Sequence, residues 1–156
     1  MLDPDLFFMG MALKLAVEAA EDGEVPIGAV AVKEGYVLGK GRNRTEATHD
    51  PTAHAEMEAI TAAANTLGDK RLDGVTLYVT LEPCSMCSGA LVLARIERLV
   101  FAAADPKAGA CGSLYRIHDD PRLNHSFQVT SGVMAEESAE LLRTFFKRLR
   151  SAERRN

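Results

Sequence analysis

The sequence contains no tryptophan and only three cysteines among its 156 residues. So few cysteines exclude the disulfide framework of a small secreted fold and are typical of a reducing compartment, which predicts a cytoplasmic protein. Long apolar runs are also missing, and the first residues lack the basic start of a signal peptide. The sequence therefore predicts neither a membrane-spanning helix nor a secretory leader.

A large excess of charge of one sign is missing as well. The formal net charge is −4, with 47% hydrophobic and 26% charged residues, and the length predicts a single globular domain over residues 1–156. Positive charge nevertheless gathers in residues 143–156. Such a cluster suits RNA binding. On charge alone, however, the favoured interpretation is the C-terminal end of a solvated helix, whose dipole attracts cations.

Two short polar motifs stand out from this ordinary composition. Residues His54 to Glu56 read H-x-E, and residues Pro83 to Cys87 read P-C-x-x-C. Together these motifs are the known signature of zinc-dependent nucleobase deaminases. Imidazole and thiolate suit zinc, and a catalytic zinc site uses three protein ligands plus water. We therefore predict that His54, Cys84 and Cys87 bind one Zn²⁺ and that Glu56 transfers protons.

Other interpretations of the same residues explain less. A C-x-x-C pair alone could be a redox pair, but that role accounts for neither His54 nor Glu56. A closed structural zinc site normally needs a fourth Cys or His ligand. The remaining cysteine, Cys111, has no partner at ligand spacing. A catalytic site is therefore favoured.

Hydrophobic periodicity predicts an α/β domain. Helices are expected at residues 4–22, 53–67 and 136–150, with another from Cys84 to residue 94, and strands at 27–32, 36–39, 75–80, 99–103 and 127–130. Thr52 is expected to cap the second helix and so to place the H-x-E motif in its first turn. The helix that ends at residue 94 is apolar nearly all round, so we expect it to be buried in the core or under a partner. Helix N-termini at strand ends bring both motifs to one sheet edge.

Three further features give weaker indications of function. Asn43, in a short polar link, reads as an ordinary turn residue. The loop at residues 105–120 reads as a surface connection, although loops of this length are often functional. Phe145 and Phe146 are adjacent and cannot share one helix face, so at least one is expected to be exposed. An aromatic side chain beside arginines could stack on RNA or could pack against the protein.

Longer sequence blocks resemble the bacterial tRNA-specific adenosine deaminases. The blocks span residues 24–30, 49–56, 77–87 and 112–114, and the likeness extends over nearly the whole chain. The two metal motifs alone specify only the deaminase superfamily, whereas the longer blocks point to its tRNA branch. The resemblance implies a cytidine-deaminase-like three-layer α/β/α fold with a mixed five-stranded sheet, and a homodimer with one Zn²⁺ per subunit.

The resemblance also implies roles for individual residues. It implies zinc on the three predicted ligands, Glu56 as the proton shuttle, and Asn43 in contact with a flipped adenine, which reverses the turn interpretation of Asn43. It further implies that the anticodon-loop channel is lined by Asp105, Lys107, Phe146 and Arg148. One departure is Cys111, where related sequences often have a small non-thiol residue, and no expected role depends on it.

The expected activity is hydrolytic deamination of adenosine to inosine at the wobble position of a tRNA anticodon, with the anticodon stem-loop as partner. A deaminase of a free nucleobase or nucleotide, of the guanine or cytosine type, would share the zinc motif and differ in its pocket walls and last helix. A non-catalytic, zinc-bearing RNA-binding module would bind RNA without needing Glu56, and the presence of an acid at that position argues against it.

Overall fold

A mixed five-stranded sheet forms the centre of the computed structural model, which describes residues 2–155. The strands are β1 (Gly28–Lys33), β2 (Tyr36–Arg42), β3 (Thr76–Leu81), β4 (Arg98–Ala103) and β5 (Gln128–Ser131), in the order β2-β1-β3-β4-β5. Strand β1 is antiparallel to both of its neighbours, whereas β3, β4 and β5 run parallel. The predicted mixed sheet is confirmed.

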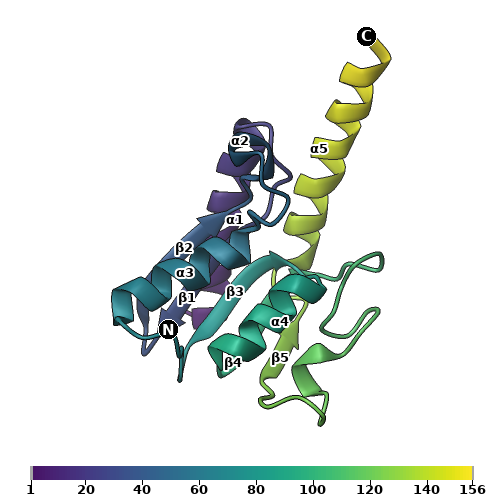
Figure 1. Cartoon of the computed structure of the whole chain (residues 1–156). Coiled ribbons are helices and arrows are strands. Elements are labelled where there is room, and N and C mark those ends of the chain that lie inside the picture. The colour runs from purple at the N-terminus through teal and green to yellow at the C-terminus, as the bar shows by residue number, and fades with distance from the viewer. Residues whose placement is uncertain (1, 156) are drawn as a thin grey trace.

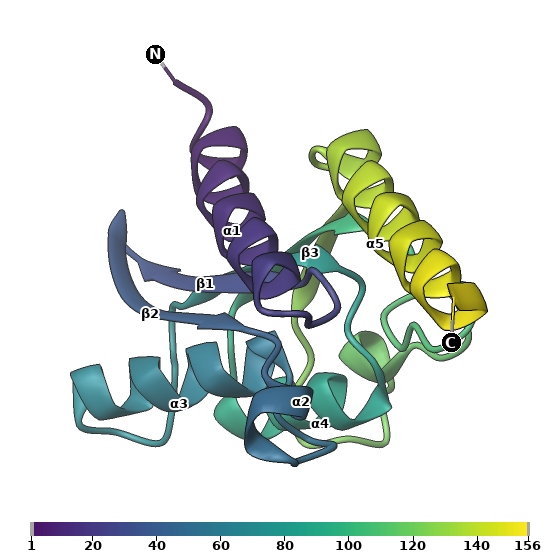
Figure 2. The same ribbon diagram turned by 90° about the horizontal axis from the view of Figure 1, so that it is seen from above.

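Helices cover both faces of this sheet and complete the predicted three layers (Figures 1 and 2). Helices α1 (Pro4–Glu21) and α5 (Ala135–Arg155) lie on one face, and α3 (Ala55–Leu67) and α4 (Ser85–Ala94) lie on the other. Two shorter elements, α2 (Thr45–Thr48) and the 3₁₀ turn at Ile117–Asp119, interrupt the loops. Each face of the sheet packs on its own hydrophobic cluster.

Close packing of α3 on β2 sets the position of the H-x-E motif. A Cβ atom added at Gly41 would collide with the carbonyl oxygen of Ala55, and one at Gly39 would collide with that of Ala59. Both strand glycines therefore let the helix backbone approach the strand more closely than side chains would allow. The start of α3 is consequently held against the end of β2.

Several boundaries differ from the sequence-based expectations. The helix expected at residues 53–67 begins at Ala55, and the last helix continues to Arg155 rather than ending at residue 150. In α4, Leu91 is fully buried but Leu93 is 83% exposed, so this chain alone does not enclose the helix on all sides. Within residues 2–155, no helix combines the length and apolarity that crossing a bilayer requires.

Candidate active site

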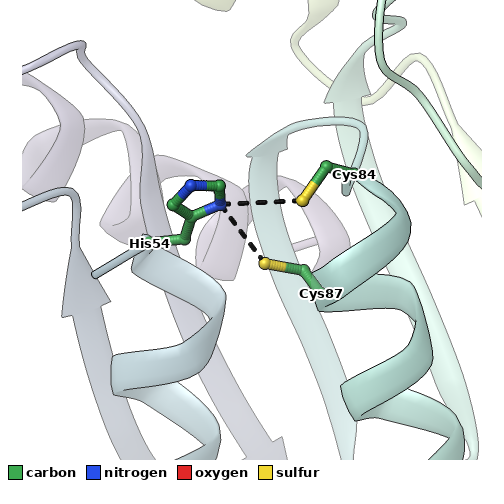
Figure 3. A group of neighbouring side chains, drawn as sticks. All are labelled: His54, Cys84 and Cys87. Atoms are coloured by element: carbon green, nitrogen blue, oxygen red, sulfur yellow. Dashed lines mark hydrogen bonds between the residues drawn. The ribbon is translucent and has the colours of Figure 1, made fainter. Parts of the chain in front are cut away.

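The two motifs meet where helices α3 and α4 begin. Cys84 is the N-cap residue of α4 and Cys87 lies in its first turn, only a few residues after the end of β3. His54 is the N-cap residue of α3. Figure 3 shows the imidazole ring of His54 facing both sulfur atoms across the gap between the two helices. The predicted convergence of the motifs is confirmed.

The expected cap of α3 is wrong in one detail. Thr52 does not cap the helix, because its hydroxyl group donates to Oδ1 of Asp50 at 2.7 Å in a local turn. The first backbone N–H of the helix, that of Ala55, instead donates to Oδ1 of Asn43 at 2.9 Å. A side chain from the end of β2 thus satisfies a helix N-terminus that the preceding residues leave open.

The three predicted ligands have the spacing of a metal-binding group. Nδ1 of His54 lies 3.7 Å from Sγ of Cys84 and 3.5 Å from Sγ of Cys87. All three atoms lie within 4.8 Å of one another, close enough to hold one metal ion. Tetrahedral zinc with its usual bond lengths would separate a nitrogen and a sulfur ligand by about 3.5 Å. The residues present fit such an ion, both in donor type and in spacing.

Electrostatics favours a thiolate in this group. Hydrogen bonds with Cys87 and His54 lower the pKa of the Cys84 thiol to about 4. The pKa of His54 is raised, chiefly by its hydrogen bond with Cys84. The pKa of Cys87 is raised because Cys84 accepts its hydrogen bond and because the thiol is buried. The Cys84 thiol therefore ionises readily, whereas the Cys87 thiol would lose its proton only when a metal cation binds.

Glu56 lies in the first turn of α3, and its side chain is 4% exposed. Burial raises the pKa of its carboxyl group to about 7, because the charged form loses its hydration. The carboxyl group also interacts with the Cys87 thiol. A carboxyl group with a pKa near neutrality can both accept and donate a proton at physiological pH. This environment suits the predicted proton shuttle.

Asn43 is buried, with 7% exposure, and fastens the end of β2 to the start of α3 through the bond to Ala55. Its oxygen is used in that bond. Among residues 2–155, no acceptor is hydrogen-bonded to its Nδ2 group, so the amide keeps its donors for a ligand. Asn43 is therefore more than a turn residue, and its contact with adenine stays a prediction.

The other predicted substrate residues lie outside the metal-binding group. Asp105 follows the end of β4, and its Oδ1 accepts from the backbone N–H of Lys107 at 3.0 Å. Lys107 is exposed on this turn. Phe146 is 39% exposed, as expected for one of the two adjacent phenylalanines, and Arg148 is exposed one turn away from Phe145. Both Phe146 and Arg148 lie in the second half of α5, and the C-terminal end of this helix projects beyond the sheet (Figure 1).

Cys111 also stays apart from the metal-binding group. Its Sγ lies 3.2 Å from Oγ of Ser88, and burial raises the pKa of its thiol to about 11. The metal-binding group found in the described residues has three members, which leaves a coordination position open for water. This arrangement is typical of a catalytic rather than a structural site.

Two buried glutamates beside the site were missed by the sequence analysis. Glu82 is 2% exposed and Glu24 is 1% exposed. Burial alone would raise the pKa of Glu82, but hydrogen bonds from Ser113 and from loop N–H groups hold it below its usual value. Glu82 stands between the apolar residue Leu81 and Pro83, and an acid in such surroundings is the signal that could have revealed it. Glu24 follows two other acids and a glycine and carries no comparable signal.

Comparison with known sequences finds deaminases. The profile of the MafB19-like deaminase family matches residues 4–150. A tRNA-specific adenosine deaminase of Aquifex aeolicus is 51% identical over 145 residues, covering 93% of this chain and 95% of the relative. Another tRNA-specific adenosine deaminase, of Bacillus subtilis, is 49% identical over 146 residues, covering 94% and 91%.

Solved structures agree with the sequence comparisons. A tRNA:A34 deaminase is 49% identical with a TM-score of 0.84, and the match covers 87% of this chain and 99% of that one. The guanine deaminase of Bacillus subtilis is 42% identical with a TM-score of 0.61, over 63% of each chain. The likeness to the tRNA enzyme thus extends over more of both chains than the likeness to guanine deaminase.

Proposed function

The chain belongs to the family of tRNA-specific adenosine deaminases, and from that premise we propose that it converts adenosine to inosine at the wobble position of a tRNA anticodon. One observation carries the reaction class: the buried Glu56 carboxyl group lies beside a three-ligand metal-binding group at the start of two helices. The substrate follows from the relatives, which match this chain over nearly its whole length.

The proposed metal is Zn²⁺, held by His54, Cys84 and Cys87. One imidazole and two thiol groups suit zinc better than magnesium or calcium, which prefer oxygen ligands. When bound, zinc would supply the Lewis acidity that makes water a nucleophile at neutral pH. The chain's own residues then have to bind the base, orient it and move two protons.

Glu56 moves those protons. Its carboxylate accepts a proton from the attacking water as the water oxygen bonds to C6 of adenine, and the resulting carboxylic acid donates that proton to N1. Glu56 then carries the remaining proton of the new C6 hydroxyl group to the 6-amino group, and the C6–N bond breaks to release ammonia as the C6 carbonyl forms. The balance is adenosine plus water giving inosine plus ammonia. In this proposal Asn43 donates a hydrogen bond from Nδ2 to the extruded base, since its Oδ1 already accepts from the N–H of Ala55.

Adenine stacked in structured RNA cannot reach such a buried site. It has to be splayed out at a cost of a few kcal/mol, which an anticodon loop lowers relative to a duplex. In the proposed complex, Asp105 and Lys107 contact the loop nucleotides from one side, and Phe146 and Arg148 contact them from α5. An exposed aromatic ring beside arginines and lysines suits single-stranded RNA.

The proposed assembly is a cytoplasmic homodimer of one-domain subunits, each with one zinc ion. Helix α4 is rich in apolar residues, and its Leu93, 83% exposed, is available for contact with the second subunit of the proposed dimer. The cytoplasmic location follows from the proposed tRNA substrate and from the low cysteine content.

The deciding experiment measures inosine formation by the zinc-loaded protein on an anticodon stem-loop with adenosine at the wobble position. Free adenosine, cytidine and guanine are assayed in parallel. We expect inosine in the stem-loop and no turnover of the free compounds. Turnover of guanine alone would favour the second candidate, a free-base deaminase. The similarity to the Bacillus subtilis guanine deaminase is the reason for testing it. Bound zinc without any turnover would favour the RNA-binding module.

A further inference from the structure

Two loops flank the metal-binding group, and each is fastened by one buried glutamate. The 44–53 loop connects β2 to α3, and the 104–116 loop follows β4. Glu24, in the connection between α1 and β1, holds the first loop, and Glu82, in the connection between β3 and α4, holds the second. Most side chains in the first loop are exposed, as are those of residues 106–108 in the second, so both loops can reach a large ligand.

The Glu82 carboxylate is enclosed by the 104–116 loop. It accepts hydrogen bonds from the backbone N–H groups of Asp105 (3.0 Å), Cys111 (3.1 Å) and Ser113 (3.0 Å). The hydroxyl group of Ser113 donates a fourth bond at 2.5 Å. A Cβ atom at Gly109 would overlap the carboxylate, so the loop leaves room for it. The loop wraps this side chain as it would wrap a bound anion.

The Glu24 carboxylate is held in a similar way by the 44–53 loop. It accepts from the backbone N–H groups of Glu46 at 3.0 Å and Ala47 at 2.8 Å, at the start of α2. The hydroxyl group of Thr45 lies 3.4 Å from the same carboxylate. In two separate connections of the chain, a buried carboxylate thus accepts hydrogen bonds from the backbone N–H groups of a loop.

Separate backbone hydrogen bonds fix each loop next to a metal ligand. The N–H of Arg44 donates to the carbonyl of Ala53 at 3.0 Å, beside His54. The N–H of Ala110 donates to the carbonyl of Pro83 at 2.8 Å, beside Cys84. Loss of either glutamate carboxylate should therefore loosen the outer part of its loop and leave the metal ligands in place.

We propose that Glu24 and Glu82 are positioning residues that hold the two loops in the geometry that binds RNA. This inference rests on the proposed function, because the loops matter only if the substrate is larger than a free base. Neither carboxylate takes part in the proton transfers. Their replacement by glutamine keeps the side-chain size but places an NH₂ group against loop donors, which breaks part of each set of hydrogen bonds.

Hydrogen–deuterium exchange tests the positioning without any assay of activity. Glu82→Gln should raise exchange in residues 104–116 only, and Glu24→Gln in residues 44–53 only. Glu97→Gln is the matched control, because it removes the same charge from an exposed position at the amino end of β4. Unchanged exchange in the loop next to either substituted glutamate would overturn the proposal.

Steady-state kinetics on the anticodon stem-loop tests the consequence for function. For Glu24→Gln and Glu82→Gln we expect KM to rise about tenfold while kcat stays within about threefold, because the lost interactions serve binding rather than the chemical step. Zinc content should stay at one per subunit. A lower melting temperature with unchanged KM would show a purely structural role and overturn the inference.

A milder variant and the unmodified protein serve as further controls. Ser113→Ala removes one of the four hydrogen-bond donors and leaves the Glu82 charge in place. It replaces Glu82→Gln in both experiments if that variant does not fold. It should raise KM in the same direction by a smaller factor. If the unmodified protein itself fails to deaminate the stem-loop, the proposed function fails, whereas the exchange experiment still decides whether the glutamates order their loops.

Discussion

Glu56 is a buried carboxyl group and Asp5 a partly buried one, at opposite ends of the sheet, and their surroundings shift their pKa values in opposite directions. Asp5 accepts hydrogen bonds from Arg98 at 3.0 and 2.7 Å and from the hydroxyl of Tyr78 at 2.9 Å, and the bonds from Arg98 lower its pKa. Burial raises the pKa of Glu56 to about 7. Asp5 therefore stays charged near neutral pH, whereas Glu56 can gain or lose a proton there.

The largest expected effect is the loss of turnover in Glu56→Gln. The amide has nearly the same shape but cannot transfer protons, so we expect the deamination rate on the stem-loop to fall at least about 1,000-fold. Zinc content and the circular dichroism spectrum should match those of the unmodified protein. A normal rate would show that another group carries the protons.

Stability should change in the opposite direction from activity at this position. The folded-state pKa of Glu56, about 7, lies above its ordinary value of 4.5, so the folded protein loses stability as pH rises between these values. In metal-free protein, Glu56→Gln should therefore raise the free energy of unfolding by about 2 kcal/mol at pH 8. Urea denaturation at pH 4 and pH 8 measures this. A gain that is equal at both pH values would contradict the raised pKa.

Asp5→Asn should have the reverse effect at the other end of the sheet. Removing the charge leaves Arg98 without its partner, and we expect a loss of about 1–2 kcal/mol at pH 7 with normal deamination. Because the folded-state pKa of Asp5 is lowered, this stabilisation is complete above the ordinary value of 3.8 and fades as pH falls through the lower folded-state value. The difference between variant and unmodified protein should therefore shrink in acid. An undiminished difference there would assign the loss to packing.

The smallest expected effect is that of Phe146→Ala on RNA binding. Loss of one base-stacking partner should raise KM for the stem-loop by about fivefold, equivalent to about 1 kcal/mol, and leave kcat unchanged. Tyr36→Ala is the control, because Tyr36 is another exposed aromatic residue, 74% exposed, in the hairpin of β1 and β2. An equal effect in both variants would remove Phe146 from the proposed RNA contacts.

Local patterns predicted the elements of the fold well. The regular spacing of apolar residues located α1 and the five strands, because those spacings follow from helix and strand geometry. Boundaries were less predictable where contacts from elsewhere decide them. Helix α3 starts at Ala55 because Asn43, from the end of a strand, accepts its first N–H. Helix α2, only four residues long, depends on the Glu24 carboxylate that meets its first N–H groups.

By itself, the sequence determined the chemical nature of the site. One imidazole, two thiols and one carboxyl group at these spacings indicate zinc and proton transfer, because donor type is a property of the side chain alone. Only the tertiary structure decided how those groups behave. The pKa of Glu56 depends on what covers it, and the roles of Glu24 and Glu82 depend on loops that fold back onto them. Burial and hydrogen bonding between distant segments exist only after the chain has folded.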